Sequence, residues 1–532
     1  MPRRIGGAVC MLLLALVGVQ EGSSPRHPLA RFTKVPVIYQ NPNPAVPLAA
    51  IVEFMTSEPV RAALVVNDGY SERVLQFRKS FQTEFTLPVL GLSPGRKSTI
   101  TVIASDRFGR RIRWPNLEFT TGPLPDDFPF LEPAVSRPQQ MEPGVTLFAP
   151  FKPGTPSYGL LVAVNAIGEV VWYYRSDENM GDVRRLRNGN LLSLDVSGAT
   201  EIDMLGNVVQ RWHPTGLGKT GHGISTPVSI DSFHHEIYPM TSDRFLVLSS
   251  ELRRLAGYPA SETDRDAPVA DANVVGDVIA EFTRDGSVVG FWRMLDLLDP
   301  YRIGFDSLSG AAWDRLYGYA VEGTKDWGHG NAVIYDPTDD SLIVSLRHQD
   351  AVVKIRYKTG DLVWILGTPE GWNTPWSRYL LSPDGDLDWP YHQHAPEITP
   401  HGTLLLFDNG NFRHSPFDGR DDVNYSRAVE YAVDVKRMSV SQVWTYGGRD
   451  SEMFFSNALG DADWMPRTGN VLITDGSRVT EGPTPSRWAR ILEVTHTTPA
   501  EKVFELIIKD RPGGPPSGWR VYRSERLRSL YP

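Results

Sequence analysis

The sequence predicts an all-β protein: a small fibronectin- or immunoglobulin-like β-sandwich followed by a six-bladed β-propeller. Three observations predict it. One hairpin pattern recurs six times, a second kind of strand pair lies between these hairpins, and the composition of 47 Gly, 42 Pro and 14 Trp suits many short strands joined by tight turns. With 532 residues the chain is long for a single core, so two domains are expected.

The repeated hairpin has a β-rich strand, a turn that often carries Gly, and an apolar strand that usually ends on an aromatic residue. The six copies are LLVAVNAIGEVVWYY, TEIDMLGNVVQRW, DVIAEFTRDGSVVGFW, AVVKIRYKTGDLVWIL, AVEYAVDVKRMSVSQVW and ARILEVTHTTPAEKVFEL. Five further strand pairs lie between them, and GVTLFAPF before the first hairpin is expected to complete a sixth. Six sets of four strands predict a six-bladed propeller over residues 140–532, which leaves only short, protected strand edges.

Residues 30–122 are predicted to form the separate β-sandwich. Short β-rich segments alternate there with turn residues, and LPVLGLSPGRKSTITVIASDRFGR resembles a fibronectin type III module. The Pro-rich stretch 122–133 marks the predicted boundary.

The first 24 residues are predicted to be a secretory signal. Arg3 and Arg4 precede an apolar run that ends near Val19, which is short for a membrane span; a retained anchor is the alternative. We therefore expect an exported protein, periplasmic or secreted, with no membrane segment in the mature form. The single cysteine, Cys10, lies in this run, so the mature chain is expected to contain no disulfide.

The net charge of −9 argues against a nucleic-acid or anionic-membrane surface as partner, because there is no basic excess to neutralise phosphates. Small molecules are the expected partners, and a homodimer is a further expectation.

Polar residues recur at one end of the predicted inner strand pairs. His235, His394 and Asp461 each stand eight residues before the turn of their strand pair. Asn331 stands nine residues before the turn of a pair whose turn is one residue longer. His329 and His392 stand two residues before Asn331 and His394, so each pair is expected to share one face of its strand.

Antiparallel pairing adds residues from the returning strands. It is expected to bring Arg347 beside His329 and opposite Asn331 or its neighbour, Asn409 near His394, and Glu251 near His235, with a bulge shifting any of these by one residue.

Several segments together resemble the bacterial aryl-sulfate sulfotransferases, the arylsulfotransferase family. They are DWGHGNAVIYDPTDDSLIVSLRHQDAVVKIRYKTGDLVWILG, QHAPEI with LLLFDNGN, YSRAVEYAVD and the closing GWRVYRSERLRSLYP. The resemblance covers the whole chain and implies a small β-domain before a six-bladed propeller. It also implies ping-pong transfer of a sulfuryl group from an aryl sulfate to a phenol, through a sulfated histidine and without a nucleotide sulfate donor.

Matched motif by motif, the resemblance makes His394 the nucleophile and assigns catalytic support to His329, Arg347 and His235. For the last position His235 is preferred over the adjacent His234. Asn331, His392 and His234 are the expected substrate-binding residues. No cofactor and no metal are expected. A neutral imidazole is a competent nucleophile, and a cation beside it would stabilise the charge on a sulfuryl group in transfer.

Three alternatives remain at this stage. A lactonase-like, metal-dependent hydrolase would use Glu251, Asn331, Asn409 and Asp461, or zinc at the HxH pair 392–394. An aryl sulfate hydrolase differs only in whether water or phenol reaches the intermediate. A propeller that only binds would need no nucleophile.

Overall fold

The computed structural model describes residues 28–532 except 153–158, 196, 219, 222, 421, 450, 483, 515 and 516. Strands dominate the described residues, in which the only α-helices are α1 (Met294–Leu297) and α2 (Ala311–Tyr317). The all-β prediction is confirmed. None of the described helices is long and apolar enough to cross a membrane. The predicted signal, residues 1–24, lies outside the described residues.

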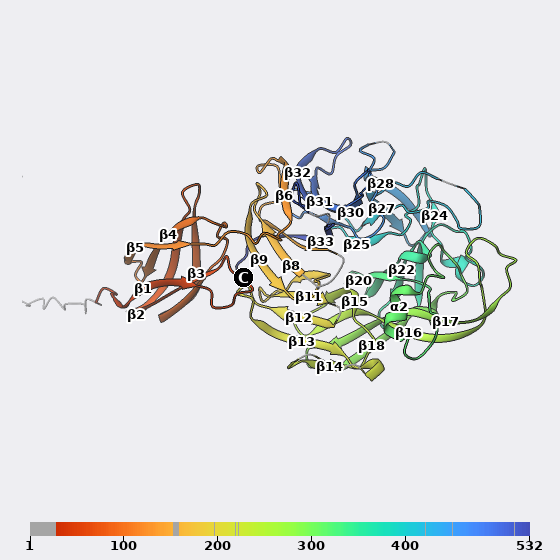
Figure 1. Cartoon of the computed structure of the whole chain (residues 1–532), viewed down its shortest axis with the longest axis horizontal. Coiled ribbons are helices and arrows are strands. Elements are labelled where there is room, and N and C mark those ends of the chain that lie inside the picture. The colour runs from red at the N-terminus through yellow and green to blue at the C-terminus, as the bar shows by residue number, and fades with distance from the viewer. Residues whose placement is uncertain are drawn as a thin grey trace, which may run out of the picture.

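The amino-terminal strands form one five-stranded sheet, at the left of Figure 1. They are β1 (Phe32–Gln40), β2 (Ala50–Asn67), β3 (Glu72–Val89), β4 (Lys97–Ser105) and β5 (Arg111–Thr120). The long β2 pairs with β1 along its first half and with β4 along its second, while β3 follows its other edge. Because β1 and β5 also contact each other, the sheet curls around a core that includes Phe54, Leu64 and Val102. The two-layer sandwich stays a prediction.

Six more sheets are described from residue 130 onward, each with four or five strands. The first joins β33 (Arg520–Leu527), β7 (Val145–Phe151), β8 (Gly159–Val164) and β9 (Val170–Ser176). The second contains β10 (Val183–Arg185), β11 (Leu191–Asp195), β12 (Gly198–Ile202), β13 (Val208–Pro214) and β14 (Thr226–Val228). The third contains β15 (His234–Pro239), β16 (Arg244–Tyr258), β17 (Ala270–Thr283), β18 (Val288–Arg293) and β19 (Lys325–Asp326).

The remaining three sheets follow in chain order. The fourth contains β20 (Gly330–Asp336), β21 (Ser341–Leu346), β22 (Ala351–Arg356) and β23 (Leu362–Gly367). The fifth contains β24 (Ser382–Pro383), β25 (His394–Ile398), β26 (Leu404–Asp408), β27 (Arg427–Asp434) and β28 (Ser439–Gly447). The sixth contains β29 (Asp461–Trp464), β30 (Val471–Val479), β31 (Arg487–Val494), β32 (Lys502–Lys509) and β6 (Phe130–Ser136).

One strand from each of these sheets contacts its counterparts in the neighbouring sheets. The contacts run β33, β10, β15, β20, β25, β29 and back to β33, so they close into a ring. This closed ring is the arrangement expected of the inner strands of a propeller. It places β15, β20 and β25, which carry the predicted histidines, next to one another.

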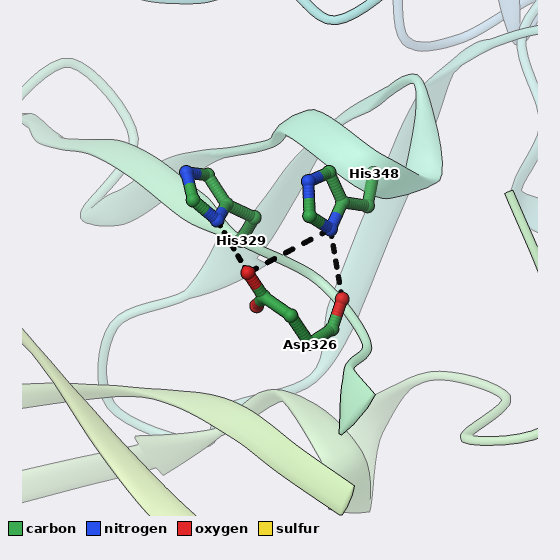
Figure 2. Close-up of side chains that lie close together, drawn as sticks. All are labelled: Asp326, His329 and His348. Carbon is green, nitrogen blue, oxygen red and sulfur yellow. Dashed lines mark hydrogen bonds and ion pairs between the residues drawn. The ribbon is translucent and has the colours of Figure 1, made fainter. Parts of the chain in front are cut away.

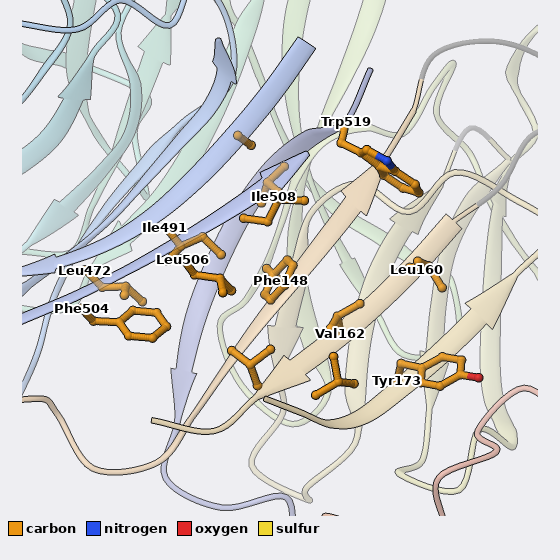
Figure 3. Packing of buried hydrophobic residues seen from close by; sticks show 14 of the residues in the cluster. Phe148, Leu160, Val162, Tyr173, Leu472, Ile491, Phe504, Leu506, Ile508 and Trp519 are labelled. Atoms are coloured by element: carbon orange, nitrogen blue, oxygen red, sulfur yellow. The ribbon is translucent and has the colours of Figure 1, made fainter. Parts of the chain in front are cut away.

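The first and last strands of the six-sheet region meet in the closure of this ring. The segment VTLFAPF does form a strand, β7, but its inner neighbour is β33 from the carboxyl terminus. Apolar side chains of the first sheet, such as Phe148 and Val162, pack against Phe504 and Leu506 of the sixth sheet (Figure 3). Arg523 and Arg526 therefore belong to an inner strand, a position that the sequence did not reveal.

The repeated tryptophans have a common physical role. The indole nitrogens of Trp172, Trp212, Trp292 and Trp444 each donate to a backbone carbonyl near the last hairpin turn of the following sheet, at 2.9, 2.9, 3.1 and 3.2 Å. A buried indole needs a partner for its N–H group, and these bonds satisfy it while they join one sheet to the next. The aromatic repeat of the sequence is thus an inter-sheet contact.

The closing core is expected to contribute strongly to stability. Phe148 is fully buried between the first and sixth sheets. Phe148→Ala should lower the free energy of unfolding by about 3–5 kcal/mol, because it leaves a cavity where the first and sixth sheets meet. Urea-induced unfolding followed by tryptophan fluorescence measures this.

The matched control for that variant is Phe291→Ala on the outer strand β18, where the side chain is 42% exposed. Its effect should stay below about 1 kcal/mol, since little apolar surface is withdrawn from water there. Equal losses in the two variants would contradict the importance of the closing core.

Candidate active site

The predicted histidines lie where three neighbouring inner strands begin, and each of these strands begins irregularly. The pairing of β15, β20 and β25 with the next strand shifts within their first residues. His235, His329 and His392 have positive φ angles of 57°, 49° and 53°. This left-handed backbone costs a residue with a side chain on the order of 1 kcal/mol, and such strain concentrates at functional sites.

His394 is the first residue of β25, and its tautomer follows from its partners. Nδ1 lies 2.6 Å from Oδ1 of Asn409 and 3.1 Å from the carbonyl oxygen of His392. The amide nitrogen of Asn409 donates to the carbonyls of Ser456 and Leu459, both at 2.8 Å, so Oδ1 faces the imidazole as an acceptor. Nδ1 of His394 must therefore carry the proton, which leaves the lone pair on Nε2.

A chain of hydrogen bonds fixes His235 in the same way. Nε2 of His234 lies 2.9 Å from the carbonyl oxygen of Ser249, which can only accept. Nδ1 of His234 is then an acceptor, and it lies 2.9 Å from Nδ1 of His235. His235 must donate from Nδ1, so it too presents the lone pair of Nε2.

Burial keeps these imidazoles neutral. It lowers the pKa of His394, His235 and His348 well below the ordinary value, and that of His234 to about 4. The positive charge of Arg347 is the next largest cause at His394. A buried site surrounded by other imidazoles and a guanidinium disfavours any further positive charge.

His329 is held by a carboxylate, as Figure 2 shows. Its Nδ1 lies 2.6 Å from Oδ2 of Asp326, and its ring stacks on His348 with 4.6 Å between centroids. Nδ1 of His348 lies 2.8 Å from the carbonyl oxygen of Asp326. Both Nδ1 atoms face acceptors, so both rings present Nε2 away from Asp326. The ring of His329 also lies 4.8 Å from that of His235.

Within the described residues, Asp326, His329 and His348 also have the residue types and the proximity of a metal-binding group. Their ligand atoms lie within 4.8 Å of one another. However, both Nδ1 atoms make hydrogen bonds with Asp326, which require protons that a metal ion would have to displace. The hydrogen-bonded arrangement thus fits a carboxylate–histidine pair for proton transfer more directly than a cation site.

Arg347 lies next to His329, since its backbone nitrogen is 3.3 Å from the carbonyl oxygen of His329. Its Nη1 is 3.2 Å from Oδ2 of Asp306. His392 is completely buried, and its Nδ1 lies 2.8 Å from Oδ1 of Asp350. The site thus combines the Arg347 guanidinium with several imidazoles.

Two further polar side chains come from the carboxyl-terminal strand β33. Arg523 is buried and donates to the carbonyl oxygen of Asn331 at 2.9 Å. The ring of Tyr522 lies 6.3 Å from that of His235, and its buried hydroxyl has no hydrogen-bond partner among the described residues. Burial raises the pKa of Tyr522, so the hydroxyl stays protonated and can donate.

An aromatic wall borders the site. Phe305 and Phe412 stack with 4.1 Å between ring centroids, and Phe412 lies 5.6 Å from the ring of His392. Both phenylalanines are only partly buried. A flat aryl group fits such a surface by stacking or edge contact.

The expected pairings are met in part. Arg347 lies beside His329 and Asn409 beside His394, as the strand register predicts. Asn331 falls in a bulge between the pairs Gly330–Leu346 and Ala332–Ser345, and its amide donates to the carbonyl of Gln393 at 2.7 Å.

Two expectations about side-chain placement are wrong. His234 pairs with Leu248, so Glu251 lies beyond His235 and instead forms ion pairs with Arg253 and Arg293, at 2.6 and 3.2 Å. The left-handed residues also break the simple alternation of faces. His392 therefore contacts Asp350, whereas His394 contacts Asn409.

The sequence interpretation did not select several residues that the structure brings to the site. They are Asp306, Asp326, His348, Asp350, Tyr522 and Arg523. Two features of the sequence could have indicated some of these residues. His348 directly follows Arg347, and Tyr522 and Arg523 stand in the closing segment GWRVYRSERLRSLYP, which carries part of the family resemblance.

Comparison with known proteins gives the family. Residues 133–517 match the family model described as Arylsulfotransferase (ASST), which is well over half of the chain. The chain belongs to the arylsulfotransferase family. The protein named arylsulfate sulfotransferase AssT from Escherichia coli O6:H1 (strain CFT073) is 30% identical over 285 residues, which are 45% of this chain and 46% of that protein. The AssT of Lelliottia amnigena is 29% identical over 281 residues, with the same coverage.

The chain thus spans a little under half the length of the curated arylsulfotransferases that it matches. Solved structures resemble it more distantly. A periplasmic gluconolactonase, PpgL, of Pseudomonas aeruginosa is 12% identical, with 71% of this chain and 99% of that chain covered and a TM-score of 0.32. A putative 6-phosphogluconolactonase from Bacteroides fragilis is 9% identical, with 87% of this chain and 98% of that chain covered and a TM-score of 0.28.

Proposed function

We propose that this protein transfers a sulfuryl group from an aryl sulfate to a phenolic acceptor without a nucleotide sulfate donor, and that His394 carries the group in between. Membership of the arylsulfotransferase family supports the reaction class. The observation that carries the assignment to His394 is its hydrogen bond to Asn409, which leaves Nε2 as an unprotonated, buried nucleophile.

In the first half-reaction, Nε2 of His394 attacks the sulfur of the donor and the bond between sulfur and the aryl oxygen breaks. The aryl oxide leaves with a proton from a nearby acid. In the second, the oxygen of the acceptor phenol attacks the sulfur, the bond between sulfur and nitrogen breaks, and the phenolic proton goes to a nearby base. A covalent intermediate of this kind gives ping-pong kinetics.

His329 is our proposed acid and base in these steps. The carboxylate of Asp326 holds its Nδ1–H at 2.6 Å and would stabilise the imidazolium that forms when Nε2 takes up a proton. His235 presents the lone pair of Nε2 beside it and is the proposed second proton acceptor. Hydrogen-bonded carboxylates generally orient a catalytic imidazole and favour its charged form.

Arg347 and the neutral donors around it would bind the oxygens of the sulfuryl group. Charge on these oxygens must be stabilised as the group moves between two nucleophiles, and fixed cationic donors in a dry site do so most effectively. Asn331, His392 and His234 stay predictions as substrate-binding residues: they lie around the site and hold its other members in place. Phe412 and Phe305 are the proposed contacts of the aryl ring.

We further propose that the six sheets from residue 130 are the blades of one propeller, with this site at its mouth, and that the protein is exported. The closed ring of inner-strand contacts supports the first proposal. The second rests on the predicted signal segment. The homodimer stays a prediction.

The decisive experiment is intact mass spectrometry of the purified protein after incubation with a chromogenic aryl sulfate alone. We expect a mass increase of one sulfuryl group, which is lost when a phenol is added. Release of the chromogenic phenol should accelerate with added acceptor. Release that ignores the acceptor would indicate hydrolysis, and no turnover by folded protein would contradict the proposal. Activity that is lost to a chelator and restored by a divalent ion would favour a metal-dependent hydrolase, with Asp326, His329 and His348 as one candidate ligand group.

The unpartnered hydroxyl of Tyr522 is expected to donate a hydrogen bond to the transferring group or the leaving oxygen. Tyr522→Phe should lower kcat about 10- to 100-fold without destabilising the protein, because only a donor at the reacting centre is removed. Steady-state rates with the aryl sulfate measure this.

Tyr258→Phe is the matched control. Tyr258 is also buried, and its hydroxyl has no partner in the described part of the chain, but it lies at the end of β16. It should leave kcat within about twofold of the wild-type value. Equal effects of the two substitutions would remove Tyr522 from the proposed machinery.

A further inference from the structure

Arg347 has a single carboxylate in direct contact within the described residues, and that carboxylate belongs to a separate loop. Nη1 of Arg347 lies 3.2 Å from Oδ2 of Asp306. The arginine side chain is 12% exposed, whereas that of Asp306 is 43% exposed. The other contact of the guanidinium is the uncharged carbonyl of Asn457, at 3.5 Å. The proposed sulfuryl-binding group is therefore already occupied by an anion.

The same oxygen of Asp306 lies 3.6 Å from Nε2 of His392. This nitrogen is buried and has no hydrogen-bond partner in the described chain, although Nδ1 of the same ring is held by Asp350. His392 and Arg347 together lower the pKa of Asp306 to about 2, so the carboxylate is charged at neutral pH. A second position for this carboxylate thus lies directly beside the first.

The backbone around Asp306 is fastened to the segment that follows Arg347. Gly304 approaches so closely that a Cβ atom on it would lie 1.9 Å from the carbonyl oxygen of His348. Arg302 donates to the carbonyl of Gln349 at 2.7 Å. With its loop fixed on the active-site segment, Asp306 can change partner by rotating its half-exposed side chain alone.

A sulfate monoester and the Asp306 carboxylate compete for the same donors. Both are anions that take up the N–H groups of a guanidinium, and two anions on one face of it repel each other. Leaving Arg347 need not leave Asp306 unpaired. Nε2 of His392 is within reach and donates to the carboxylate once it takes up a proton from solvent, since Nδ1 already donates to Asp350.

We propose that Asp306 is a positioning residue that holds the Arg347 guanidinium in the empty site, yields it to the sulfuryl oxygens of an arriving aryl sulfate, and turns to His392. This inference rests on the proposed function for the identity of the arriving anion.

The test is Asp306→Asn, which keeps the shape of the side chain and removes its charge. Without the competing anion, the KM for the aryl sulfate should fall about fivefold while kcat changes by less than about twofold. The concentration of inorganic sulfate that gives half-maximal thermal stabilisation should fall by a similar factor. This gain should vanish when Arg347→Lys is added, because the two residues act on one another.

The matched control is Asp296→Asn, which removes another exposed aspartate paired with an arginine, Arg253, at 2.5 Å. It should change neither KM nor sulfate binding. A loss of kcat at unchanged KM in Asp306→Asn would overturn the proposal, because Asp306 would then orient Arg347 for the reaction. Unchanged sulfate binding would overturn it as well.

The sulfate measurement separates this inference from the proposed function, since it needs no turnover. If the wild-type protein transfers no sulfuryl group and Asp306→Asn still binds sulfate more tightly, the function is wrong and the role of Asp306 stands. If the wild type is active and sulfate binding is the same in both proteins, only the role of Asp306 fails.

Discussion

Replacing His394 by asparagine is expected to abolish sulfuryl transfer, with a loss of about 10⁴-fold or more, because a nucleophile has no substitute in a two-step mechanism. The asparagine amide can still bond with Asn409, so the fold should be retained. The variant should also gain no mass when incubated with an aryl sulfate, whereas the wild type should gain one sulfuryl group. The two measurements together test the chemical step and the intermediate.

The control for this variant is His401→Asn, at the far end of the hairpin that begins with His394. His401 is exposed at the turn between β25 and β26 and contacts the ring of Trp464 at 5.0 Å. Its replacement should leave the transfer rate and the mass gain unchanged. A His394→Asn protein that still forms the adduct would move the nucleophile to another imidazole, with His235 and His329 as the candidates that present Nε2.

The second large effect is expected at Arg347. Arg347→Lys keeps the positive charge but loses the planar fork that binds two oxygens at once. We expect kcat/KM for the aryl sulfate to fall about 10²- to 10³-fold, the range found when one donor to a developing charge is removed from a preorganised site. Because Arg347 is largely buried, an ammonium group on a flexible chain cannot reproduce the two-nitrogen geometry of the guanidinium there.

Arg356→Lys provides the comparison, since Arg356 lies at the other end of the same sheet and is 48% exposed. It should keep wild-type kinetics. A loss at Arg347 confined to KM, with kcat unchanged, would mean that the guanidinium binds the donor and does not stabilise the transition state, which contradicts the proposed role.

The sequence by itself determined the all-β class and, through its family resemblance, supplied the candidate nucleophile. The repeated hairpin predicts the observed strands because turn residues separate its β-rich, apolar runs, and the aromatic residue at its end marks an inter-sheet contact such as that of Trp212. The spacing of His329, Arg347 and His394 also placed them at one end of their strands, because antiparallel pairing across a short turn leaves little freedom.

Only the tertiary structure decided what these side chains can do. The tautomer of His394 depends on the amide of Asn409, and that amide is oriented by two carbonyls of the loop between β28 and β29. Local spacing likewise could not show that Tyr522, near the carboxyl terminus, reaches His235. Hydrogen-bond direction and burial are set by groups distant in the chain, so they exist only once the ring of inner strands has closed.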